Sequence, residues 1–243
     1  MFDFFVNLIL PLNKILFNNL GLTIIFIGIL TRLVFWPLFS SQLRHTKAMS
    51  DLKPKLDEIK KKYKGDQKRQ LEEQSKLFKS HGVSPLGGCL PTIVQLIVTI
   101  LLYQVLFKLL KLDVDTQFLS WNLAKPDTFH IQQIPFALPG LLVLLTAVAT
   151  FIQSKMIIPQ TANAKPLSSK NGEEKPDFAE ALQASSSQMV YFTPLLMLYI
   201  GTQLASGLAL YWSVSTILAI IQQYQVTGLG GLRPWLTKLR LKR

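Results

Sequence analysis

Residues 189–227 contain no aspartate, glutamate, lysine or arginine, and this run restricts the folds open to the chain. A helix that crosses a hydrocarbon core of roughly 30 Å needs about 20 residues, so the run is too long for one upright crossing. Ser206 and Gly207 lie near its centre. We expect two short spans, 189–205 and 208–226, joined by a tight turn, and one long tilted helix is the alternative.

Three further apolar segments alternate with charged ones and predict spans at 20–39, 85–107 and 135–157. The expected number of transmembrane helices is therefore five. Only 16% of the residues are charged, against about 25% in an ordinary soluble domain. The sequence predicts an all-α integral membrane protein, with residues 20–243 as a single membrane domain.

Residues 1–19 precede the first span and have apolar side chains at helical spacing. These side chains are Phe5, Leu8, Ile9, Leu12 and Leu16. The pattern favours an amphipathic helix that lies in the membrane interface. The alternative is that these residues begin the first span. We expect no cleavable signal peptide, because the first ten residues lack a basic residue and no small-residue cleavage site follows.

Residues 42–82 are rich in lysine and carry a thin apolar stripe, which predicts a helical hairpin standing in water. Gly65 interrupts the helical pattern in the middle. The first helix would place Leu52, Leu56, Ile59 and Tyr63 on one face, and the second would place Leu71, Ser75 and Phe78. So thin a stripe buries little surface, so we expect a mobile hairpin.

The net charge of +12 is concentrated beside the apolar runs. We therefore expect it to set membrane orientation and to attract lipid rather than to bind a specific nucleic acid. Cytoplasmic placement of the hairpin and the basic tail at 228–243 puts the N-terminus and the 108–134 loop outside. The polar 159–187 loop then lies in the cytoplasm. A cell membrane and a thylakoid membrane both satisfy these rules.

Arg32 is the only charged residue of the first span, roughly 10 Å below its cytoplasmic edge at about 1.5 Å per residue. A buried arginine in a membrane is costly and usually faces water or a polar interior. No predicted span contains an acidic residue, so we expect a groove that is wet from the cytoplasm. The alternative is an arginine whose head reaches the interface while its stem covers lipid.

Several uncharged polar residues accompany Arg32 at membrane depth. They are Gln95, Gln104, Gln153, Gln203 and Gln222. For most of them we expect an interhelical hydrogen bond. Gln153 is the best groove candidate because it lies near the depth of Arg32. Tyr211 and Trp212 are candidates for an apolar groove wall, or for ordinary aromatic anchors at the interface.

The sequence gives little support to an enzyme. HExxH, GxSxG and P-loop motifs are absent, the predicted spans hold no carboxylate, and Cys89 is the single cysteine. We expect no catalytic residues, no metal and no cofactor. A transporter that uses Arg32 as an anion site is an alternative, although no internal repeat is evident. A membrane scaffold or assembly chaperone is another.

Four segments resemble the YidC/Oxa/Alb family of membrane protein insertases, in the family's order. They are LTRLVFWPL (30–38), MSDLKPKLDEIKKKYKGD (49–66), HGVSPLGGCLPTIVQLIVTILLYQVL (81–106) and SGLALYWSVSTILAIIQQY (206–224). The resemblance covers nearly the whole chain. It implies five spans around a groove that opens to the cytoplasm and to lipid, and insertion of nascent proteins without nucleotide hydrolysis.

The resemblance also implies residue roles. Arg32 would supply the charge of the groove, Gln153, Trp212, Tyr211 and Gln95 would line it, and the hairpin would contact incoming chains through Lys53, Lys60, Lys61, Lys62 and Lys68. Nascent membrane proteins would be the partners, together with the Sec translocon, targeting factors and the ribosome. We expect a departure from the family pattern in the absence of a large outer domain and of a lipoprotein cysteine, and in a short C-terminal tail.

Overall fold

The computed structural model describes residues 2–83, 90–109, 115–130, 137–157, 191–233 and 237. Its helices are α1 (Phe2–Ile15), α2 (Leu20–Val34), α3 (Trp36–Asp51), α4 (Lys53–Lys62), α5 (Gln67–Ser80), α6 (Leu90–Leu109), α7 (Leu141–Ile157), Tyr191–Gly201, α9 (Ser206–Thr227) and the short η1 (Gly230–Leu232). Two small antiparallel ladders pair β1 (Gln117–Phe118) with β2 (Trp121–Asn122) and β3 (Thr128–Phe129) with β4 (Leu138–Pro139).

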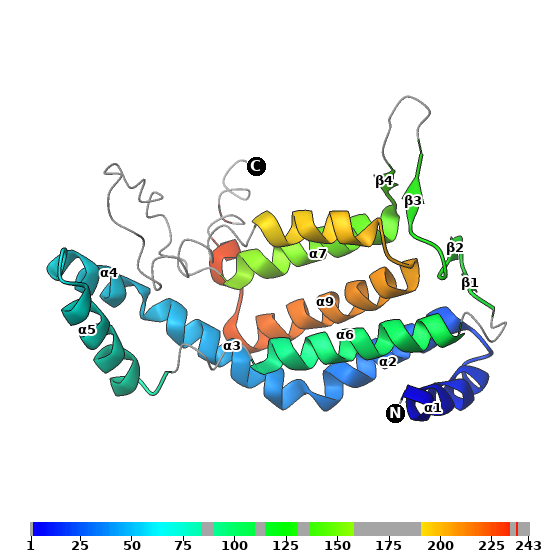
Figure 1. Ribbon diagram of the computed structural model, residues 1–243, viewed down its shortest axis with the longest axis horizontal. Coiled ribbons are helices and arrows are strands. Elements are labelled where there is room, and N and C mark those ends of the chain that lie inside the picture. Colours follow the sequence, from blue (N-terminus) through cyan, green and yellow to red (C-terminus); the bar gives the residue numbers. More distant parts are fainter. Residues whose placement is uncertain are drawn as a thin grey trace.

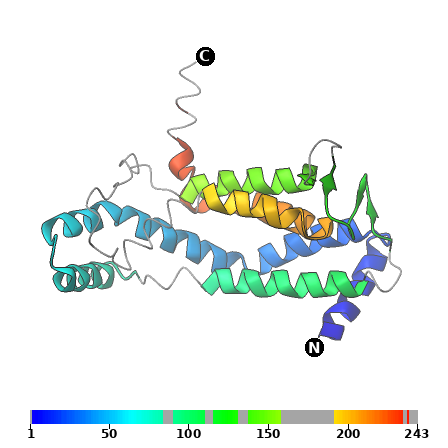
Figure 2. The same ribbon diagram turned by 45° about the horizontal axis from the view of Figure 1, so that its top comes forward.

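Helix α9 forms the centre of the bundle, between α7 on one side and α2 on the other (Figure 1). Its residues Leu208, Ala209, Leu210 and Tyr211 join the buried core with Leu20 and Ile24 of α2 and Val143 of α7. The β-ladders lie at one end of the bundle, which we call the capped end. Helices α3, α4 and α5 extend from the other, which we call the hairpin end (Figure 2).

By length and apolar composition, no single helix among the described residues is sufficient to cross a membrane. The two segments Ile9–Ile15 and Leu20–Val34 are sufficient together, but the chain bends by 115° between them. Helix α1 is thus not a straight beginning of the first span. The number of five spans stays a prediction.

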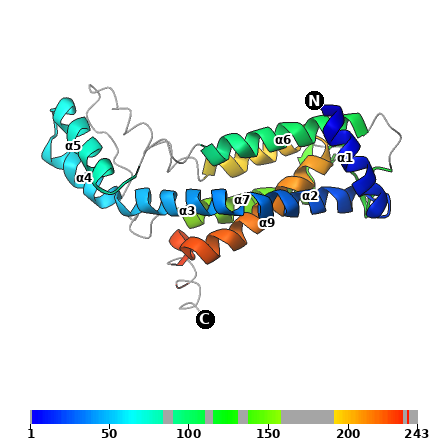
Figure 3. The same ribbon diagram turned by 90° about the horizontal axis from the view of Figure 1, so that it is seen from below.

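The segment after the first predicted span differs from our expectation, because a second helix begins inside that span. Helix α2 ends at Val34, Phe35 interrupts it, and α3 runs unbroken from Trp36 to Asp51. Figure 3 shows α3 extending beyond the bundle toward α4 and α5. Pro37 lies in the first turn of α3, where its fixed φ and missing N–H favour the start of a helix. Residues 42–51 therefore continue α3 toward the hairpin.

The turn between α4 and α5 contains Gly65, whose φ of +92° lies in the left-handed region that glycine tolerates best. The buried face of α5 is not the one predicted. Gln70 and Gln74 are buried, whereas Leu71 is 48% exposed. The predicted stripe is wrong at Leu71 and Ser75, which are exposed, whereas Phe78 is half-buried, because polar rather than apolar side chains occupy most of the buried side of α5.

The span predicted at 135–157 begins later, since α7 starts at Leu141 and Pro139 belongs to β4. The uncharged 189–227 run holds two helices, Tyr191–Gly201 and α9, rather than one tilted helix. The 159–187 loop and almost all of the basic tail lie outside the described residues, as does the start of the span predicted at 85–107.

Candidate functional site

Arg32 lies in the last turn of α2, one turn before the break at Phe35. Its Cζ atom is 4.1 Å from the centroid of the Phe39 ring, which belongs to α3 and is only 7% exposed. Its Nε atom is buried and has no hydrogen-bond acceptor. The side chain extends toward the hairpin end, as a snorkelling arginine would, and its guanidinium packs on a buried ring.

Tyr211 of α9 lies near Arg32, within range of an electrostatic interaction. The tyrosine is 1% exposed, and its hydroxyl accepts a hydrogen bond from Nε2 of Gln95 at 3.3 Å. A Cβ atom on Gly28 would lie 3.7 Å from the Tyr211 ring, so α2 and α9 approach each other closely one turn before Arg32. The structure thus brings three of the predicted site residues together: Arg32, Tyr211 and Gln95.

Gln222 connects α9 to the beginning of α3. Its Nε2 atom donates to the Trp36 carbonyl at 2.9 Å and to Ser40 Oγ at 2.8 Å. The side chain is fully buried, and its Oε1 atom has no partner. For Gln222 and Gln95, the expected interhelical hydrogen bond is confirmed.

Gln153 and Trp212 are half-buried on α7 and α9. In the part of the chain that the structure describes, no hydrogen bond joins either residue to Arg32. Trp212 packs beside the buried core. Their place in a common groove with Arg32 is therefore still a prediction.

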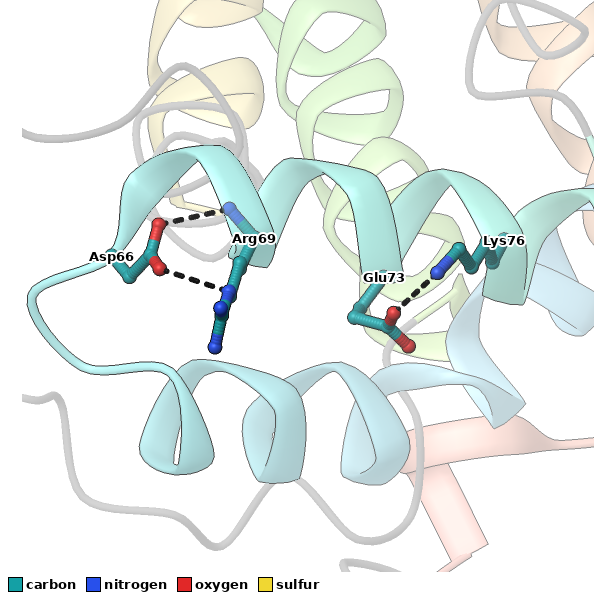
Figure 4. A network of polar contacts seen from close by, with 4 residues as sticks. All are labelled: Asp66, Arg69, Glu73 and Lys76. Carbon is teal, nitrogen blue, oxygen red and sulfur yellow. Dashed lines mark hydrogen bonds and ion pairs between the residues drawn. The ribbon is translucent and has the colours of Figure 1, made fainter.

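The predicted contact lysines of the hairpin lie on α4 and α5. Lys61, Lys62 and Lys68 are exposed, and Lys53 and Lys60 are half-buried. Ion pairs on α5 hold Arg69 to Asp66 and Lys76 to Glu73 (Figure 4). The hydrogen bond from Lys76 to Glu73 raises the pKa of the Lys76 ammonium. The outer faces of α4 and α5 therefore present positive charge along with these local pairs.

The capped end contrasts with this arrangement because its polar groups are paired. Asp127 Oδ2 accepts from the backbone N–H groups of Leu142 and Val143 at 2.7 and 3.3 Å, which caps α7. The first N–H groups of α9, from Ser206 and Gly207, donate to the carbonyls of Lys125 and Leu123. Residues 122–127 therefore close this end of the bundle.

Among the described residues, no three His, Cys, Asp or Glu side chains lie close enough together to hold a metal ion. What the structure brings together is Arg32 of α2, Tyr211 of α9 and Gln95 of α6. Such a set can hydrate and attract a polar or acidic segment.

Comparison with known proteins identifies the family. The model of the 60Kd inner membrane protein family matches residues 12–229. A membrane protein insertase YidC of Fusobacterium nucleatum is 32% identical over 88% of this chain and 88% of its own length. Proteins of that name from Rickettsia prowazekii and Magnetococcus marinus are 31% and 33% identical, but the chain spans only 35% and 34% of their lengths.

The chain therefore belongs to the YidC/Oxa/Alb family of membrane proteins.

Three residues that hold the two ends of the bundle were not predicted from the sequence. Phe39 is seven positions after Arg32, a spacing that returns to the same face of a continuous helix, but Pro37 signalled a helix end. Asp127 caps a helix that begins fourteen residues later, and a cap is recognised in a sequence only when it adjoins the helix. The carbonyl of Leu123 at the start of α9 carries no side-chain signal.

Proposed function

We propose that the protein inserts other proteins into the lipid bilayer through a hydrophilic groove around Arg32, without nucleotide hydrolysis. One observation carries the proposal most directly: an arginine of α2 is enclosed beside α9 with a buried Nε atom that has no acceptor. A buried donor without a partner is uncommon in proteins. An incoming segment with polar or acidic residues would provide the acceptor.

In this mechanism the protein lowers the free-energy barrier to insertion and hydrolyses no nucleotide. The polar tail of a nascent segment enters beside Arg32, Tyr211 and Gln95, so it does not cross a bilayer of full thickness. The apolar part partitions into lipid at about 0.8 kcal/mol per buried CH₂. For an acidic tail that moves outward, the membrane potential adds about 2.3 kcal/mol per charge per 100 mV.

Lipid surrounds the bundle in this proposal. Helix α6 exposes Ile93, Leu96, Ile97 and Ile100, and α7 exposes Leu141, Leu144, Leu145 and Val148. Apolar surface of this extent is unusual in water. We propose five spans, formed by α2 with the start of α3, α6, α7, Tyr191–Gly201 and α9, with the N-terminus outside and the hairpin and tail in the cytoplasm.

Photocrosslinking in reconstituted vesicles tests the groove. A crosslinker replaces Gln153, and a ribosome-bound chain is stalled as its apolar segment emerges. We expect a crosslink to the nascent segment that weakens in Arg32→Ala, together with reduced insertion of an acidic-tailed substrate. Arg32→Lys should retain part of the activity because it keeps the charge but not the planar fork.

Arg44→Ala is the matched control, since Arg44 is an exposed arginine on α3 away from the break. It should insert substrates at the rate of the unaltered protein. Insertion that proceeds equally in vesicles without the protein would contradict the proposal, and anion uptake dependent on Arg32 would favour a transporter.

A further inference from the structure

Two side chains, one from α2 and one from α9, hold the beginning of α3 after the break. From α2, the Arg32 guanidinium lies on the Phe39 ring of α3 at 4.1 Å. From α9, Gln222 donates to the Trp36 carbonyl and to Ser40 Oγ at the beginning of α3. Both contacts hold the first turns of α3, so together they fix the angle at which α3 leaves the bundle.

The hairpin is carried by α3. No break interrupts α3 between Trp36 and Asp51, and only Leu52 separates it from α4 (Figure 1). A helix of this length extends roughly 24 Å at 1.5 Å per residue. A small change of angle at Phe35 therefore becomes a displacement of several ångströms at the hairpin.

The stacked position of Arg32 also limits what it can bind. A carboxylate that pairs side-on with a guanidinium uses Nε and a terminal nitrogen. In the structure Nε is enclosed and lacks an acceptor. Because Nε has almost no accessible surface, a carboxylate can bind it only after the guanidinium or the side chains around it move. Movement of the guanidinium would break its contact with the Phe39 ring, and the new hydrogen bond would offset that loss.

We propose that Phe39 is a positioning residue that latches Arg32 across the α2–α3 break, and that a carboxylate in an incoming segment releases this latch and so frees α3 and the hairpin to move. This inference rests on the proposed insertase function. Stacking on Phe39 and pairing with a carboxylate compete for the same guanidinium, so weakening the stacking should strengthen carboxylate binding by at most the same factor.

Binding measurements on the full chain in lipid nanodiscs test the latch. The probes are two membrane peptides that differ only in their tails, one with aspartates and one with asparagines. Phe39→Leu removes the ring and should tighten binding of the aspartate peptide by roughly 2- to 30-fold, the range expected for a cation–π contact. Binding of the asparagine peptide should not change. If Phe39→Leu acts only through lost packing, it should weaken the binding of both peptides or leave the binding of both unchanged.

Spin-label distances test the movement. Cys89 is the only cysteine, so labels placed at Lys61→Cys and Tyr224→Cys in a Cys89→Ser background report the hairpin against α9. We expect the distance distribution of the otherwise unaltered protein to broaden or shift with the aspartate peptide but not with the asparagine peptide. Phe39→Leu should show the altered distribution without peptide, and Phe39→Tyr, which keeps a ring, should not.

Phe26→Leu is the control, because it makes the same change at a 41% exposed side chain of α2 away from the break. If the aspartate peptide binds through Arg32 but neither Phe39→Leu nor the peptide alters affinity or distances as described, the latch is wrong and the insertase proposal stands. If Arg32→Ala affects neither binding nor insertion, both proposals fail together.

Discussion

The two ends of the bundle treat buried polar groups in opposite ways. At the capped end, the first N–H groups of α7 and α9 are paired with Asp127 and with backbone carbonyls of residues 123–125. At the hairpin end, by contrast, lie all the buried side-chain atoms that lack a partner within the described part of the chain. These are Arg32 Nε, His45 Nε2, Gln74 Nε2, Gln222 Oε1 and Gln223 Oε1.

An unpaired buried polar atom costs stability, so its presence indicates a place where a partner or water is to be bound. The comparison therefore suggests a division of tasks: the capped end stabilises the bundle, and the hairpin end holds the groups that act on another molecule. Substitutions at the capped end should mainly lower stability, whereas those at the hairpin end should mainly alter function.

Among the substitutions considered below, Gly201→Ala at the capped end should cause the largest loss of stability. An added Cβ would lie 2.6 Å from Val143 Cγ1, where the helix Tyr191–Gly201 meets the start of α7. Overpacking of this kind costs about 1–3 kcal/mol, to be measured by reversible unfolding in mixed detergent micelles. Adding Val143→Ala should recover part of the loss by making room. A Gly201→Ala protein as stable as the original would show that Val143 can shift to make room at little cost in free energy.

Asp127→Ala should have the next largest effect. It removes the acceptor for two N–H groups at the start of α7 and should lower the free energy of unfolding by about 0.5–2 kcal/mol. Asp115→Ala is a matched control, because Asp115 is an exposed carboxylate that accepts one backbone N–H in the same segment. Equal losses for the two variants would argue against a special role for the cap.

Gln222→Leu at the hairpin end should cost less than Asp127→Ala although Gln222 is fully buried. The change loses two donated hydrogen bonds but also removes the unpaired Oε1 atom, so we expect a net loss of at most about 1 kcal/mol. Ser40→Ala in the same chain should reduce that loss by removing the hydroxyl left without a donor. A double-mutant cycle measures this coupling.

The smallest effect concerns the α5 ion pair. Lys76 is fully exposed, and its hydrogen bond to Glu73 raises its pKa, so any stabilisation is present below the ordinary lysine pKa and is lost as the pH rises through the raised value. We expect Lys76→Ala to leave the thermal midpoint unchanged at neutral pH, since exposed pairs contribute little. A clear drop would mean that the hairpin is more tightly organised than its contacts indicate.

Apolar and charged runs were sufficient to predict the helical class and most helix positions, because these depend on composition over many residues. The family was predicted separately, from the resemblance of four segments. The residues of the site could be predicted only one at a time. Arg32 was conspicuous as the lone charge of its segment, but Pro37 signalled a helix end before Phe39, so the shared face of the two residues was not recognised. The buried amides of α5, Gln70 and Gln74, were missed because polar side chains leave no apolar spacing in the sequence.

The hydrogen bonds that hold the start of α9 also limit which changes residues 122–127 can accept. The acceptors for Ser206 N–H and Gly207 N–H are the carbonyls of Lys125 and Leu123, which every amino acid possesses. The side chain of Lys125 can therefore be exchanged without loss of these bonds, provided that the backbone path is kept. Deleting or inserting one residue between 122 and 127 would move both acceptors at once, so the length of this segment is more constrained than its composition.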